Sequence, residues 1–145
     1  MYPTSLSRVG RLVLLVAIAA GLTGCSSSEV VTTTDDAHIK QVAVLYGQFI
    51  GMNKGKPPAD EKAFKTFVQQ NLTARQSTDT VETVLTSPRD KQPYVLRYGV
   101  LAGTDKPAVV VYEQTGKNGK RFVGLSHGGT EEVDDKKFKE LVPNG

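Results

Sequence analysis

The chain has 145 residues, of which 39% are hydrophobic, and it carries 18 Lys and Arg residues against 15 Asp and Glu residues. A chain of this length has room for one domain, which would bury roughly 65% of the surface that the unfolded chain exposes. Two of the 18 basic residues, Arg8 and Arg11, lie within the first 24 positions, so 16 basic residues face 15 acidic ones in the remainder. Domains that bind nucleic acid normally carry a clear basic excess, so we expect no nucleic-acid partner.

Residues 1–24 have the pattern of a bacterial export signal. They contain two arginines, no acidic residue and an apolar run at residues 12–22. As a helix this run would span only about 16 Å, whereas a membrane-spanning helix needs about 20 residues. We therefore interpret residues 1–24 as a signal peptide that is removed, rather than as a transmembrane helix.

The apolar run ends in Leu22-Thr23-Gly24-Cys25, which resembles the lipobox of bacterial lipoproteins. The resemblance implies cleavage between Gly24 and Cys25 and acylation of Cys25, so that acyl chains hold the protein on a membrane of the cell envelope. Each buried methylene contributes about 0.8 kcal/mol to such an anchor. In lipoproteins of diderm bacteria, a serine after the cysteine, here Ser26, goes with transfer to the outer membrane. The inner membrane and the outer face of a monoderm membrane stay open as alternatives.

The division of the chain follows from these signals. After the signal peptide, residues 25–35 form the lipidated cysteine and a flexible tether, because the segment is rich in Ser and Thr and has no hydrophobic periodicity. Residues 36–145 form a single domain. The one cysteine of the chain cannot form an internal disulfide, so this domain has to fold without one.

Two helices are predicted at the start of the domain. After Asp35 and Asp36, which can cap a helix, apolar residues recur at helical spacing up to residue 50, and glycines and a Pro-Pro pair then end the pattern. A second helix begins near Asp60, and its apolar face includes Phe64 and Phe67. We expect the two helices to pack through their aromatic residues. A short helical turn at residues 81–85 and a turn at residues 87–90 follow.

The hydrophobic period changes to two after residue 93. Strands are predicted at residues 94–98, 108–114, 121–126 and 130–133. The second and third form a hairpin, because Asn118-Gly119 is typical of a tight turn with positive φ. Asp134 caps a last short helix. The connections between strands are too short for parallel crossovers, so we predict an α+β domain with an antiparallel meander of three to four strands.

A second, weaker resemblance concerns the fold. A helix followed by an antiparallel meander, with a Ser-Pro-Arg-Asp turn at residues 87–90 and Pro-Tyr at residues 93–94, resembles the heads of pseudopilins. This implies at most a shared head, because pseudopilins keep a hydrophobic N-terminal helix, whereas this leader should be cleaved and replaced by lipid. Such an analogy of fold carries no function by itself.

No set of residues in the sequence has the pattern of a catalytic or metal site. His38 and His127 are the only histidines and are not at ligand spacing, so we predict no metal and no cofactor. Ser126 and His127 are adjacent in a strand and would point to opposite faces, which disfavours a nucleophile and base pair. The candidate binding residues are therefore Glu113, Lys117, Lys120, Arg121 and His127. For Glu113, which ends an apolar strand, we expect a cross-strand ion pair with Lys120 or Arg121.

The sequence thus predicts a membrane-anchored lipoprotein with a non-catalytic binding or envelope-structure domain, whose partner is an unknown protein or envelope component. An enzyme acting on an envelope polymer is the first alternative, and it would need a catalytic role for Glu113 or His127. A pseudopilin-head-like assembly component is the second.

Overall fold

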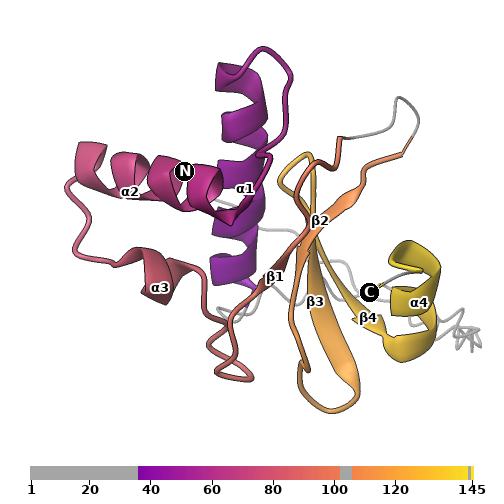
Figure 1. Cartoon of the computed structure of the whole chain (residues 1–145). Helices are drawn as coiled ribbons and strands as arrows, with labels where there is room; N and C mark the ends of the chain where they lie inside the picture. Colours follow the sequence, from indigo (N-terminus) through magenta and orange to yellow (C-terminus); the bar gives the residue numbers. More distant parts are fainter. Residues whose placement is uncertain (1–35, 102–105, 144) are drawn as a thin grey trace, which may run out of the picture. The chain divides into compact units, whose positions relative to one another are not determined.

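The structure, a computed structural model, describes residues 36–101, 106–143 and 145. The predicted signal peptide, the cleavage site at Gly24 and Cys25, and the tether up to residue 35 lie outside the described residues. Eight elements follow one another along the chain (Figure 1): α1 (Ala37–Met52), α2 (Glu61–Ala74), α3 (Val81–Val84), β1 (Val95–Leu96), β2 (Val109–Tyr112), β3 (Lys120–Leu125), β4 (Thr130–Asp134) and α4 (Asp135–Leu141). This order confirms the predicted α+β class.

Most helix starts are determined by local side-chain caps. The carboxylate of Asp60 accepts a hydrogen bond from the Ala63 amide at the start of α2, and Asp134 accepts one from the Lys137 amide at the start of α4. α1 differs from the prediction at Asp36, which makes no side-chain cap, and Asp35 lies outside the described residues. Its carboxylate instead accepts a hydrogen bond of 3.1 Å from the hydroxyl of Thr130 at the start of β4. This contact joins the beginning of the domain to the edge of the sheet.

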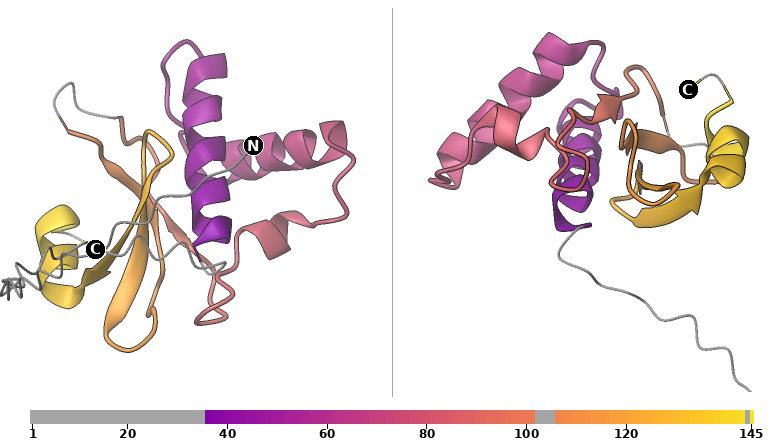
Figure 2. Two further views of the ribbon diagram at one scale, coloured as in Figure 1. Left: turned by 180° about the vertical axis from the view of Figure 1, so that it is seen from behind. Right: turned by 90° about the horizontal axis from the view of Figure 1, so that it is seen from below.

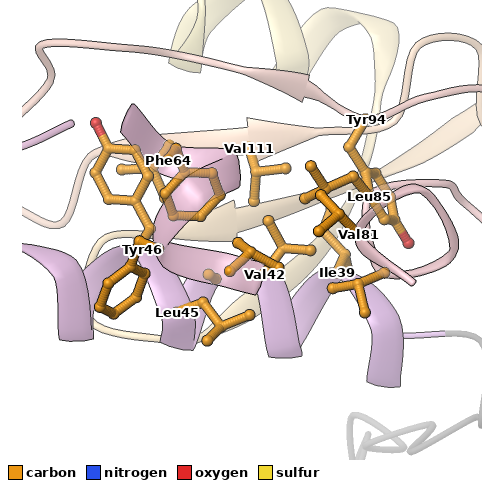
Figure 3. Close-up of a cluster of buried hydrophobic side chains, with 14 of the residues drawn as sticks. Ile39, Val42, Leu45, Tyr46, Phe64, Val81, Leu85, Tyr94 and Val111 are labelled. Carbon is orange, nitrogen blue, oxygen red and sulfur yellow. The ribbon is translucent and has the colours of Figure 1, made fainter. Parts of the chain in front are cut away.

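The first two helices pack through aromatic side chains, as predicted. Phe64 of α2 lies 5.7 Å from Tyr46 and 6.4 Å from Phe49 between ring centroids, and Phe67 lies 5.3 Å from Phe49 in an edge-to-face arrangement. The Tyr46 hydroxyl donates to the carbonyl of Arg97 at 2.8 Å. Tyr46 therefore connects the helices to the loop that follows β1. Figure 3 shows Tyr46 and Tyr94 at opposite ends of the hydrophobic cluster beside α1.

The four strands form an antiparallel sheet in the order β1-β2-β3-β4, so β1 and β4 are its edges. β1 has only two residues, against five in the prediction, because regular pairing with β2 covers only Val95 and Leu96. The turn between β2 and β3 has positive φ at Asn118 and Gly119, as the Asn-Gly pair predicts. β3 and β4 pair without interruption over five residues.

A bulge in β2 places apolar side chains on both faces of the sheet. Val109 pairs with Leu125 and Val111 with Gly124, so β2 contains one residue more than β3 between these pairs. Val110 and Val111 consequently both belong to the core beside α1, whereas Val109 and Tyr112 belong to the cluster beside α4. All four residues of β2 are buried. Figures 1 and 2 show α1, α2 and α3 on one side of the sheet and α4 on the other.

Gly124 of β3 allows α1 to lie close to the sheet. A Cβ atom at this position would come within 2.5 Å of Val111 Cγ1 and 3.0 Å of Ala43 Cβ. Such distances are too short for carbon atoms, so a larger residue would force α1 and β2 apart.

Candidate functional site

The most extensive polar contacts of the described chain join the loop after α3 to the β2–β3 hairpin. We call residues 87–92 the clamp loop. Two main-chain hydrogen bonds hold it in a turn. The Ser87 amide donates to the Gln92 carbonyl at 2.9 Å, and the Lys91 amide donates to the Ser87 carbonyl at 3.1 Å. The Ser87 hydroxyl also accepts a hydrogen bond from the Arg89 amide at 3.1 Å. This folding directs the side chains of Ser87, Arg89 and Asp90 toward the hairpin.

Glu113 is the acceptor at the centre of these contacts and is 1% exposed. One carboxylate oxygen accepts from the Ser87 hydroxyl at 2.8 Å, and the other accepts from the Phe122 amide at 2.8 Å. In an antiparallel ladder that amide would bond to a main-chain carbonyl. The Glu113 amide does donate to the Phe122 carbonyl, at 3.0 Å. The side chain of Glu113 therefore takes one position in the ladder and binds the clamp loop at the same time.

The ionic partner of Glu113 is Arg89, and the predicted cross-strand pair with Lys120 or Arg121 is wrong. Arg89 Nε lies 3.6 Å from the Glu113 carboxylate, and Arg89 Nη1 lies 2.9 Å from the Glu132 carboxylate. The guanidinium also lies over the Phe122 ring, 4.3 Å from its centroid. An acid in the interior needs a charged partner, and the clamp loop supplies one from 24 residues away in the chain.

Asp90 makes the second attachment of the clamp loop. One carboxylate oxygen accepts three hydrogen bonds, from the Thr115 amide, the Thr115 hydroxyl and the Gly116 amide, at 2.9 to 3.1 Å. The other oxygen accepts from the Gln92 amide at 3.1 Å. Partial burial raises the pKa of Asp90, but these hydrogen bonds outweigh burial and hold the pKa below its ordinary value. Asp90 therefore stays ionised and bonded to the hairpin at neutral pH.

Tyr94 closes the buried side of this region. Burial, reinforced by the negative charge of Glu113, raises the pKa of the Tyr94 hydroxyl well above its ordinary value. The Tyr94 amide donates to the Leu85 carbonyl at 2.8 Å, which holds the clamp loop together at its base. The Tyr94 hydroxyl therefore stays uncharged beside the ion pair of Glu113 and Arg89.

Three lysines stand on the outside of this arrangement. Lys117 and Lys120, two of the candidate binding residues, are exposed at the tip of the hairpin, and Lys91 is exposed on the clamp loop. The loops that carry them are in contact, because Asp90 bonds to Gly116. We call Lys91, Lys117 and Lys120 the lysine platform. Sequence reasoning missed Lys91, because only the tertiary contact of Asp90 brings its loop to the hairpin.

Arg121 has a structural role on the other face of the sheet. It lies 2.9 Å from the Asp135 carboxylate, donates to the Gln114 carbonyl at 3.1 Å, and lies over the Phe138 ring at 4.2 Å from the centroid. Its side chain is 19% exposed. Arg121 therefore fastens α4 to the sheet and is not part of the lysine platform.

His127 lies at the opposite end of β3 from the lysine platform, in the turn before β4. It is exposed, and a Cβ on Gly129 would come within 2.7 Å of its ring. Ser126 is buried, and its hydroxyl accepts a hydrogen bond from the Ala108 amide at 3.2 Å. The structure therefore does not bring His127 together with Glu113 or with the candidate lysines.

Two further features concern metals and membranes. Across residues 36–101, 106–143 and 145, no three His, Cys, Asp or Glu side chains come together as a metal site would need. In the same part of the chain, no helix combines the length and the hydrophobicity needed to cross a bilayer.

Comparison with known proteins gives no family assignment. No protein-family model, no curated protein and no solved structure matches this chain. What the site can do must therefore be inferred from its geometry. The buried Glu113 and the partly buried Asp90 fix two loops against each other, while exposed amines on those loops can bind an anionic group of a partner.

Proposed function

We propose that this protein is a lipoprotein of the bacterial cell envelope, anchored by acyl chains on Cys25, with a non-catalytic binding or structural domain at residues 36–145. The leader with its Leu22-Thr23-Gly24-Cys25 sequence supports the anchor. Ser26 favours the outer membrane as the location.

The rigid support of the lysine platform is the observation that favours a binding role. Glu113 and Asp90 together accept six hydrogen bonds from the two loops and their flanks. A surface that is already ordered loses little conformational entropy when a partner binds. The platform therefore suits recognition better than two independent flexible loops would.

The alternatives have less support in the geometry. An enzyme that used Glu113 would need substrate to reach a carboxylate that is 1% exposed and bonded through both oxygens. The pseudopilin-head alternative rests on the packing of a helix against an antiparallel meander, which many unrelated domains share.

Photo-crosslinking in intact cells tests the binding role. The probe belongs at Lys117 and at His127, which are exposed, rather than at Gly128, where φ is +86° and a Cβ would lie 3.0 Å from Val44 Cγ2. A probe on the exposed face of α2, at Gln70, is the matched control. We expect a discrete adduct from at least one end of the sheet and none from Gln70. Absence of protein adducts from both ends would contradict the binding role.

The anchor has a separate test. Cys25→Ser removes the thiol that accepts the lipid, so the variant should accumulate as an uncleaved precursor. Normal processing of this variant, measured by mass spectrometry, would refute the lipoprotein proposal.

A further inference from the structure

The register of the sheet determines which main-chain groups of β4 face outward. Phe122 of β3 directs its amide and its carbonyl toward Glu113 of β2, so the residues on either side of Phe122 direct theirs toward β4. Their partners in β4 are Glu131 and Val133. The main-chain groups of Glu132, which stands between these two partners, therefore point away from β3, and by the same alternation those of the first residue of β4 do too.

This outer edge of β4 is open within residues 36–101, 106–143 and 145. The sheet order gives β4 a single neighbouring strand, β3. The outward amides of Thr130 and Glu132 have no hydrogen-bond acceptor in this part of the chain. The side chains of Glu131, Glu132 and Asp134 are exposed, so the described elements do not cover the edge. Such a row of amides and carbonyls is a template for a further strand.

The hydrogen bond between Asp36 and Thr130 brings the start of the domain to this edge. It joins the Asp36 carboxylate to the Thr130 hydroxyl at 3.1 Å, and Thr130 is the first residue of β4. The chain that precedes Asp36 therefore arrives at the beginning of the open edge. It runs toward Thr130, whereas β4 runs away from Thr130, so pairing between them would be antiparallel. Because the fold already holds Asp36 there, little additional entropy of loop closure opposes such pairing.

The residues that arrive at the edge have the composition of a strand. Residues 31–34 are Val-Thr-Thr-Thr, four consecutive β-branched residues, and only Asp35 separates them from Asp36. At about 3.3 Å per residue they span about 13 Å, most of the roughly 17 Å of the five-residue β4. They carry no charge, so the exposed Glu131 does not repel them as it would repel a second copy of β4. Their hydroxyls can also donate to carboxylates.

We propose that residues 31–34 add to the sheet as a strand antiparallel to β4, and that residues 25–30 alone form the tether. The added strand occupies the edge of β4, which is then closed to a strand from any other chain. The inference does not depend on the lipid anchor, since residues 31–34 follow Cys25 in the acylated and in the unmodified chain alike.

Amide hydrogen exchange, measured by NMR on the full chain in detergent micelles, tests the proposal. The amides of Glu131 and Val133 bond to β3 and should exchange slowly in either case. Those of Thr130 and Glu132 are protected only if another strand accepts from them. We expect both to exchange about tenfold or more slowly than unstructured amides, because several hydrogen bonds must open together.

A pair of proline variants identifies the occupant of the edge. In the double variant Thr32→Pro with Thr33→Pro, one of the two lost amides would face β4 in either register, so pairing is removed. We expect Thr130 and Glu132 to exchange about tenfold faster in this variant, while Glu131 keeps its protection and reports that the domain stays folded. The control, Ser27→Pro with Ser28→Pro, places the same residues in the remaining tether and should change nothing.

Three outcomes would overturn the proposal. Rapid exchange of Thr130 and Glu132 in the unaltered chain would show that the edge is open. Protection that survives Thr32→Pro with Thr33→Pro would assign the edge to another occupant, and its loss on dilution would identify a second copy of the chain. Equal loss of protection in the two double variants would show that residues 31–34 have no special part in it.

Discussion

The buried carboxylate of Glu113 gives the sharpest prediction about stability. In Glu113→Ala, the Ser87 hydroxyl and the Phe122 amide lose their acceptor, and Arg89 keeps only Glu132 as a charged partner. Removal of one member of a buried ion pair costs about 3–5 kcal/mol, because the other polar groups stay buried without partners. For a domain of this size, 1 kcal/mol corresponds to about 4 °C in Tm. We therefore expect Tm to fall by roughly 12–20 °C.

Glu113→Gln separates the charge from the hydrogen bonds. The amide oxygen can still accept from the Phe122 amide, and the NH₂ group can donate to the Ser87 hydroxyl, which is able to accept. What the variant loses is the ionic interaction with Arg89 and the charge-assisted strength of the two hydrogen bonds, worth about 1–2 kcal/mol. The expected fall in Tm is about 4–8 °C.

Thermal unfolding followed by far-ultraviolet circular dichroism measures both variants, since the chain has no tryptophan for fluorescence. Glu140→Ala is the control, because Glu140 is half-exposed and lies 3.7 Å from Lys137, in a surface pair worth at most about 0.5 kcal/mol. If Glu113→Ala and Glu140→Ala had the same Tm, the clamp would contribute nothing measurable and the case for a rigid platform would fail.

Three further predictions follow from the same structure. The lowered pKa of Asp90 stabilises the fold above the ordinary carboxyl pKa, so the Tm advantage of wild type over Asp90→Asn should be full near neutral pH and be lost as the pH falls through the lowered pKa. An advantage independent of pH would contradict the ionised carboxylate. Gly124→Ala should lower the free energy of unfolding by about 1–3 kcal/mol, because the new methyl group would clash with Val111 and Ala43. Urea titration measures this change, and an unchanged midpoint would show that α1 can move away from the sheet without loss of stability. Burial, reinforced by the charge of Glu61, raises the pKa of Tyr98 to about 12, so the alkaline step that Tyr98→Phe removes from the 295 nm titration should lie near that pH rather than near 10.

The local features of the fold could be predicted from the sequence because their causes are local. Asp60 and Asp134 cap helices within their own first turns, and Asn118-Gly119 specifies its turn by backbone conformation alone. The aromatic contact between α1 and α2 also follows from helical periodicity, since it aligns one stripe on each helix. These elements can be predicted because each depends on residues that lie only a few positions apart in the chain.

The candidate site could be predicted only in part, because its contacts join distant segments. A glutamate after an apolar strand signals that a cation must lie nearby, but periodicity does not distinguish Arg89 from Lys120 or Arg121 as that cation. Four consecutive apolar residues in β2 likewise conceal the bulge that divides them between two cores. Asp36 is a further example. Its carboxylate accepts a hydrogen bond from the Thr130 hydroxyl, 94 residues away, instead of capping its own helix.

The two edges of the sheet would matter if the proposed lipid anchor holds the protein on a membrane. Anchored molecules are concentrated in two dimensions, where strands of neighbouring copies meet often and can pair edge to edge. β1 offers only two residues for such pairing, and β4 exposes Glu131, whose negative charge would face that of a second copy. The short β1 edge and the acidic β4 edge therefore disfavour edge-to-edge pairing between copies.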